Sequence, residues 1–242
     1  MTPFEKTAPE MVLDERTPAG LGGRWYGVYP ALVTDIKDPD GLGRVRVTLP
    51  WVVDPEGGRY EAWARLATMM GGKNRGSWFV PDVDDEVLVA FEAGEPRRPY
   101  VVGCLWNGRD TPPESMDGAG NNHRKVICSR SGLKITLDDS TGRENVLIET
   151  PGGQKVKLQD GLGSVEVADS AGNSLKLEPT GVTITASARV AIQAAQMEIT
   201  VGQLSVNAGM SQFAGMVQAM AVNSPSVISA TYTPGLGDTL GL

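Results

Sequence analysis

The sequence has few of the residue types on which catalysis and metal binding depend. Its 242 residues include one histidine and two cysteines. A Ser-His-Asp or Cys-His arrangement would need His123 as its base, and the polar residues around His123 provide no orienting partner. We therefore expect no enzyme activity, no cofactor and no bound metal. Cys104 and Cys128 form neither a disulfide framework nor a metal motif, and their strand-like surroundings predict buried free thiols.

Long apolar runs and an excess of basic residues are also missing. No run reaches the roughly 18 apolar residues that a membrane-spanning helix needs. The first residues contain Glu5, Lys6 and Glu10 and lack the apolar core of a secretory signal, so we expect synthesis in the cytoplasm without a signal peptide. The 22 Lys and Arg against 29 Asp and Glu give a net charge of −7, and no nucleic-acid partner is expected.

Three other patterns have simple structural interpretations. The acidic cluster from Asp82 to Glu86 lacks the spacing of a calcium loop and predicts a turn before a strand. The segment Gly41–Arg44 lacks the Lys-Ser/Thr of a phosphate loop and predicts a hairpin turn. Aromatic residues in the first half are expected to pack in a core or between subunits rather than stack on bases; they are Trp25, Tyr26, Trp51, Trp63, Trp78 and Phe79.

The second half, from about residue 126 to residue 230, is a series of short strand signals. Each has two apolar residues on either side of one outward position, and the period of 2 is typical of half-buried strands. Between Val146 and Leu204 the pairs follow one another at steps of 7 to 10 residues, as in a solenoid-like stack. The pairs are Leu133/Ile135, Val146/Ile148, Val156/Leu158, Val165/Val167, Leu175/Leu177, Val182/Ile184, Val190/Ile192, Met197/Ile199, Leu204/Val206 and Met220/Val222.

A ribbon with one strand per step cannot bury its apolar face by itself. Three copies wound into one triangular prism would share a core. Asp238 is the only charged residue from Ile199 to Leu242, which suits a narrow, tightly wound rod. An ordinary antiparallel sandwich with irregular hairpins remains the alternative. The inward residues expected in the trimer core are Val146, Ile148, Val156, Leu158, Val165, Val167, Leu175, Leu177, Val182 and Ile184.

The first half predicts a separate small domain. Residues 1–23 are polar and proline-containing and are expected to be an extended or flexible arm. Strand signals follow at 25–35, 43–49, 61–67, 86–92 and 100–105, with no helix pattern between them. Five short strands in 24–107 predict a barrel of the OB type. The fold class is therefore all-β, with a linker at 108–125, a needle at 126–223 and a turn-rich C-terminal segment at 224–242.

Five ordered blocks in residues 24–107 resemble the barrel domain of spike proteins from contractile injection systems. The blocks are Gly43–Val47 with Pro50–Trp51, Trp63–Ala67, Arg75–Pro81, Asp85–Phe91 and Gly94–Asn107. This family includes the VgrG spikes of type VI secretion, phage baseplate assembly protein V and the central spikes of extracellular contractile injection systems. The resemblance implies an OB barrel followed by an intertwined, trimeric, triangular β-helix.

The resemblance also implies a function. We expect a structural homotrimeric needle, part of a virion or injection-system baseplate, that contacts the target membrane only transiently during puncture. The 23 residues before the barrel cannot encode a hub module, so the hub is expected to be a separate protein at the N-terminal end. Residues 108–125 are too few for a lysozyme domain, and a single histidine cannot supply a histidine-held metal at a needle tip.

The C-terminal segment is similar to spike ends that carry a PAAR-type tip protein. The expected tip-binding residues are Tyr232, Pro234, Leu236 and Leu240. The alternative function is a trimeric β-helical tail fibre or tailspike that binds or cleaves surface glycans. Exposed aromatic residues would be expected along such a fibre, and residues 126–222 contain only Phe213.

Overall fold

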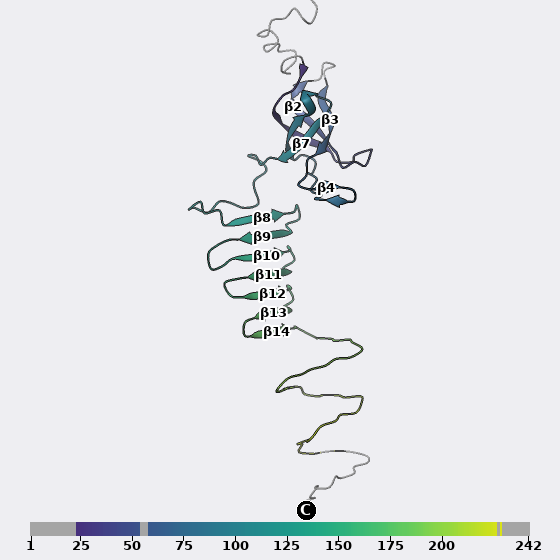
Figure 1. Cartoon of the computed structure of the whole chain (residues 1–242), viewed down its shortest axis with the longest axis vertical. Helices are drawn as coiled ribbons and strands as arrows, with labels where there is room; N and C mark the ends of the chain where they lie inside the picture. Colours follow the sequence, from purple (N-terminus) through teal and green to yellow (C-terminus); the bar gives the residue numbers. More distant parts are fainter. Residues whose placement is uncertain (1–22, 54–57, 227, 229–242) are drawn as a thin grey trace, which may run out of the picture. The chain divides into compact units, whose positions relative to one another are not determined.

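A computed structural model describes residues 23–53, 58–226 and 228 of the chain (Figure 1). These residues form no α-helix, and a short 3-10 turn spans Glu92–Gly94. Among them, no helix is long and apolar enough to cross a membrane. The chain divides into two units, residues 1–189 and 190–242, which we describe separately. The all-β fold class predicted from the sequence is confirmed.

Five strands close into a barrel, as predicted. The barrel order is β1-β2-β3-β7-β6, in which β3 and β7 pair in parallel and the other neighbours are antiparallel. A two-stranded hairpin, β4 with β5, interrupts the chain between β3 and β6 and was not predicted. The bounds are β1 Val28–Asp35, β2 Val45–Val53, β3 Arg59–Leu66, β4 Gly71–Gly72, β5 Arg75–Gly76, β6 Glu86–Phe91 and β7 Pro99–Cys104.

Alternate residues of the barrel strands form its core. Val33, Val45, Val47, Leu49 and Val87 are fully buried, with 0% exposure. An aromatic cluster adjoins this core: the Trp25 ring lies 4.9 Å from the Phe91 ring and 5.0 Å from the Tyr60 ring, centroid to centroid. Closing the sheet on itself lets these residues bury one another within a single chain.

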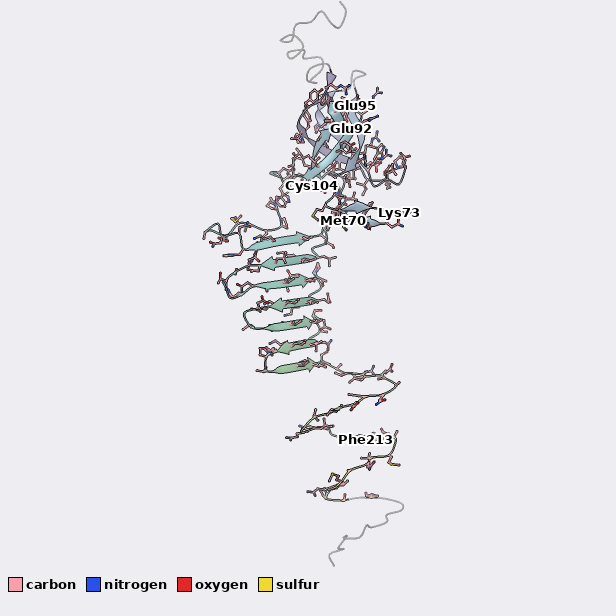
Figure 2. The ribbon with its side chains drawn as sticks, in the orientation of Figure 1. Met70, Lys73, Glu92, Glu95, Cys104 and Phe213 are labelled. Atoms are coloured by element: carbon pink, nitrogen blue, oxygen red, sulfur yellow. The ribbon has the colours of Figure 1, made fainter. Side chains whose placement is uncertain are left out.

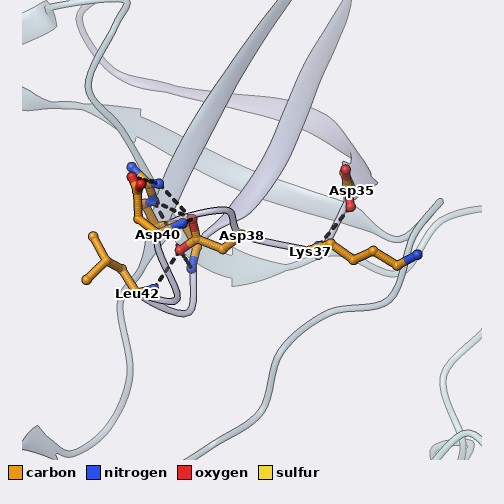
Figure 3. Close-up of polar contacts among 6 residues, drawn as sticks. Asp35, Lys37, Asp38, Asp40 and Leu42 are labelled. Carbon is orange, nitrogen blue, oxygen red and sulfur yellow. Dashed lines mark hydrogen bonds and ion pairs between the residues drawn. The ribbon is translucent and has the colours of Figure 1, made fainter.

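The turn between β1 and β2 is organised by one carboxylate (Figure 3). Asp38 accepts backbone N–H groups from Asp40 at 3.1 Å, Leu42 at 2.8 Å and Arg44 at 3.1 Å. The Arg44 guanidinium donates to the same carboxylate at 2.6 Å. This guanidinium, together with the backbone donors, holds the pKa of Asp38 well below its usual range. The hairpin turn predicted around Gly41 is therefore present, and hydrogen bonds to the Asp38 carboxylate hold it in place.

Residues 124–185 form a second sheet of seven antiparallel strands, each paired with the next along the chain (Figure 1). Every strand is five residues long. Their bounds are β8 Arg124–Cys128, β9 Lys134–Asp138, β10 Asn145–Glu149, β11 Lys155–Gln159, β12 Ser164–Ala168, β13 Ser174–Glu178 and β14 Gly181–Thr185. One strand per step is what the sequence predicted, but consecutive strands reverse direction as hairpins rather than winding as a solenoid.

Two sequence predictions about this half need correction. The pair in β9 is Ile135/Leu137, because Leu133 lies before the strand. The strand signals at Val190/Ile192, Met197/Ile199, Leu204/Val206 and Met220/Val222 do not form strands, since none of the described residues after Thr185 belongs to one. A strand requires a neighbouring backbone to accept and donate its hydrogen bonds, and no described segment of this chain pairs with residues 190–226.

Candidate trimer interface

Strict alternation places the predicted core residues on one face of the seven-stranded sheet. In every strand from β9 to β14 the second and fourth residues are apolar. Successive side chains in a strand point to opposite faces, so all of these residues share a face. The ten side chains expected in a trimer core are all among them.

The register aligns these residues into two rows that cross the sheet. Directly opposite residues join each row from one strand to the next. The first row is Ile127, Ile135, Ile148, Val156, Val167, Leu175 and Ile184; the second is Leu137, Val146, Leu158, Val165, Leu177 and Val182. Leu137 was missed from the sequence because Leu133 fits the same period of 2 and shifted the expected pair by two residues. Ile127 was missed because β8 has no second apolar residue on this face, where Lys125 lies opposite Leu137.

This apolar face is uncovered in the single chain. Val182 and Ile184 are each 65% exposed, and most other members of the two rows are exposed as well. Burying one side chain of this size stabilises a protein by about 1.5–3 kcal/mol. A continuous apolar surface on a soluble domain indicates a contact with another protein surface. The apolar face of this sheet is therefore a candidate surface for contact with another protein chain.

Apart from Leu147, the opposite face is polar in its central row from β9 to β14 and carries alternating charges. Lys157 lies directly opposite Glu166, which lies directly opposite Lys176. Lys155 Nζ is 3.0 Å from a carboxylate oxygen of Glu166. Glu178, 2.7 Å from Lys176 Nζ, raises the pKa of that lysine. One apolar and one charged face are typical of an antiparallel sheet with water on one side only.

Side-chain hydrogen bonds in the turns set this register. The Asp169 carboxylate accepts backbone N–H groups from Ala171 and Asn173, both at 2.9 Å, and the Asn173 amide at 2.7 Å. These bonds, the Asn173 side chain first, lower the pKa of Asp169. Gly172 has φ of +87°, a conformation that L side chains rarely adopt. A slip of one residue would move the whole apolar set to the polar face, so these turns protect the interface.

The remaining candidate residues divide into several groups. Asp85 accepts the Asp82 N–H at 2.8 Å, and Asp82 pairs with Arg130 at 2.9 Å, so this acidic cluster forms the predicted turn. Within the described ranges, no group of three or more His, Cys, Asp or Glu residues is arranged to hold a metal ion. Cys104 and Cys128 are free but exposed, which corrects the expectation of buried thiols.

Two groups of residues that were predicted to make contacts include residues outside the part that the structure describes. Tyr232, Pro234, Leu236 and Leu240, the expected tip-binding residues, are all outside them. Of the aromatic residues expected to pack, Trp25 is buried, whereas Tyr26, Trp78 and Phe79 are exposed in the single chain. The Trp63 ring is half-buried, and the Cζ atom of the Arg44 guanidinium lies over it, 5.8 Å from the ring centroid. The Trp51 side chain lies outside the described part.

Comparison with known protein families agrees with both halves of the fold. Residues 29–106 match the type VI secretion system/phage-baseplate injector OB domain, and residues 145–210 match the phage baseplate V C-terminal trimerisation domain. Together the two matches span more than half of the chain. They define a class of protein in which an injector barrel precedes a trimerisation domain. The chain belongs to the VgrG and phage baseplate V family of structural spike proteins.

Individual relatives are similar over about half of this chain. Type VI secretion system spike protein VgrG1b of Pseudomonas aeruginosa is 29% identical over 128 residues, 50% of this chain and 17% of its own length. VgrG1a of the same organism is 31% identical over 116 residues, 45% of this chain and 18% of its own. VgrG3 of Vibrio cholerae is 26% identical over 117 residues, 45% of this chain and 11% of its own. The chain spans less than a fifth of the length of these curated relatives.

Proposed function

We propose that this protein is the structural, non-enzymatic central spike of a contractile phage-tail-like particle. The observation that carries the proposal is the uncovered apolar face of β8–β14. This face overlaps the matched trimerisation domain, which begins at residue 145 in β10. A sheet with two apolar rows and no cover of its own within the described chain requires partners, and two further copies supply identical faces.

Three copies of the sheet form the walls of a triangular prism. The two apolar rows of each wall face the axis and meet those of the other two copies, while the Lys157–Glu166–Lys176 face remains in water. Every wall is held by its own chain's strand ladder. The prism is therefore stiff along its length, as a part that transmits force to a small tip must be.

Directly beyond Thr185 the same apolar pairs continue, and as far as residue 201 no strong turn residue interrupts them. The chain contains no Gly, Pro, Asn or Asp from residue 182 to residue 201, whereas the hairpins of the sheet contain Gly153, Gly163 and Gly172 at positive φ. Without these residues the chain is poorly suited to reverse direction. In the proposed trimer these segments continue around the axis and pair with the other two copies, which gives the intertwined β-helix.

The ends of the spike connect it to other components. A separate hub protein holds the N-terminal end, and a PAAR-type tip protein occupies the C-terminal end through Tyr232, Pro234, Leu236 and Leu240. On contraction the spike pierces the target envelope. The support for these steps is the family and the C-terminal sequence. The glycan-binding alternative has less support, because Phe213 is the only aromatic residue in 126–222.

The mass of the purified full chain in solution, measured by light scattering, tests the proposal. We expect three times the chain mass of 25.7 kDa, and rod-shaped particles in negative-stain images. A folded, soluble monomer of the unaltered chain would overturn the proposed function. Adding a purified PAAR-type protein to the full chain and to a chain lacking residues 231–242 tests the tip contact. Binding is expected only to the full chain, and equal binding to both would refute that contact.

A further inference from the structure

The barrel displays a group of large apolar side chains that nothing in the single chain covers. These side chains, which we call the loop patch, come from the β1–β2 turn and from residues 67–80: Leu42, Met69, Met70, Trp78 and Phe79. Trp78 is 76% exposed and Phe79 69% exposed. Met70 lies directly before the β4–β5 hairpin (Figure 2). Four of the five lie within residues 69–79, which exceeds the scattered exposure that is normal for a soluble domain.

The loop patch is held in place by ordered contacts. The Trp78 ring packs against Gly43 so closely that an added Cβ would lie 2.9 Å from a ring carbon. The Thr68 hydroxyl donates to the Ser77 carbonyl at 2.8 Å, and the Ser77 N–H donates to the Met70 carbonyl at 2.9 Å. The backbone of this loop and the Trp78 ring are therefore ordered before binding, and a pre-ordered ring loses little conformational entropy in a permanent contact.

A second apolar surface covers the outside of a different part of the barrel. It lies on β1, β6 and β7, and we call it the strand patch: Val28, Pro30, Leu32, Leu88, Ala90 and Val102. Val28 lies directly opposite Ala90, and Pro30 directly opposite Leu88. These positions alternate with the buried core residues of the same strands, so they face outward. Outward positions of a small barrel in water are ordinarily polar.

The two patches differ in position and in charge. The loop patch adjoins Trp63 and Arg65 of β3, and the strand order places β3 across the barrel from β1 and β6. Arg65 and Arg97 border the same groove as Trp78, and no acidic partner within the described residues pairs with either side chain. Asp84 and Asp85 are exposed just before β6, where Glu86 lies opposite Leu32. The groove beside the loop patch therefore has more basic than acidic residues in its lining, with Glu92 among them, whereas one end of the strand patch is acidic.

We propose that the loop patch of each barrel docks on the strand patch of the next copy in the trimer. A threefold ring needs two different, complementary surfaces on every subunit, because each contact is heterologous. This barrel has two such surfaces, with complementary charge at their edges. The proposal rests on the trimer of the proposed function, in which the joined needle keeps the barrels at an effective concentration of roughly millimolar. The ring gives the spike a second trimer contact besides the needle.

The contact is tested by cross-linking in the full chain. Cys104→Ser and Cys128→Ser remove the native thiols, and Lys73→Cys beside the loop patch and Val28→Cys in the strand patch introduce a pair. With a short bismaleimide we expect covalent dimers and trimers on a denaturing gel. Each single-cysteine variant should remain monomeric on the gel, since like patches do not meet. Arg59→Cys paired with Val28→Cys is the matched control, because Arg59 is exposed but belongs to neither patch.

Hydroxyl-radical footprinting provides a second readout that leaves the patches unaltered. Oxidation of Trp78 should be several-fold lower in the trimer than in a variant that is monomeric. If the unaltered chain is a monomer, the proposed function and the ring both fail. If it is a trimer in which Lys73→Cys and Val28→Cys do not cross-link and Trp78 is fully oxidised, the barrel contact alone is wrong. Cross-linking of the Lys73→Cys variant with itself would also contradict the assigned pairing.

Discussion

The barrel and the seven-stranded sheet are built from the same kind of strand but bury their apolar residues differently. Both alternate apolar and polar residues with a period of 2. In the barrel the sheet closes on itself, and Val33, Val45 and Val47 are fully buried. In β8–β14 the sheet remains a single layer, and Val182 and Ile184 are each 65% exposed. The difference shows that an apolar face can be completed within one chain or left for assembly to complete.

This comparison separates two kinds of stability. The barrel core is formed by contacts within one chain, so its stability does not depend on protein concentration except through the proposed ring. The needle sheet depends on its partners, so its stability is linked to assembly. All five tryptophans, from Trp25 to Trp106, precede the sheet, and four of them lie within the barrel residues, so tryptophan fluorescence reports mainly on the first half.

The largest effect is expected from a charge on the apolar face. Val182→Asp would bury three carboxylates around the trimer axis, and unpaired buried charges cost several kcal/mol each. We expect loss of the trimer by light scattering while tryptophan fluorescence remains that of a folded barrel. Thr183→Asp is the matched control, because Thr183 is the next residue, faces the other side and lies opposite Lys176. A trimer that survives Val182→Asp would show that this face is not in the core.

A cavity in the barrel should have an intermediate effect and act on the other region. Leu49 is fully buried, and Leu49→Ala is expected to lower the free energy of unfolding of the barrel by about 2–5 kcal/mol. Denaturant unfolding followed by tryptophan fluorescence measures this change. Ile36→Ala, at a 41% exposed position, is the control and should change it little. Loss of the trimer in Leu49→Ala would indicate that the two regions fold as one unit.

The smallest effect is expected from pH acting on the Asp38 turn. The Arg44 guanidinium, with backbone N–H donors, lowers the pKa of Asp38 in the folded barrel. The stabilisation by this carboxylate is therefore complete above the ordinary aspartate pKa of about 3.9 and is lost as pH falls toward the lower folded value. Thermal unfolding followed by tryptophan fluorescence between pH 7 and pH 2 should show a smaller acid-induced decrease in Asp38→Asn than in the unaltered chain. An equal decrease in both proteins would exclude Asp38 as the cause.

The local sequence pattern determined much of the secondary structure of this protein. The period-2 alternation located the five barrel strands within a few residues and identified five of the seven sheet strands with the correct inward residues. It did so because alternation and turn chemistry act between residues that are close in sequence. The apolar pairs also predicted that one chain is insufficient, since two inward residues per strand cannot form a core.

Only the tertiary structure decided the features that depend on residues distant in sequence. Pairing of β3 with β7 closes the barrel across more than thirty residues. Trp78 and Phe79, which lie between these two strands in the sequence, remain exposed in the single chain. The true pair in β9 is Ile135 with Leu137, because hydrogen bonding to β8 and β10 decides where the strand begins and ends, and the alternation of Leu133, Ile135 and Leu137 does not. Past Thr185 the alternation continues but no strand forms in one chain. Period 2 specifies which residues share a face, whereas a strand exists only where another backbone is present to pair with it.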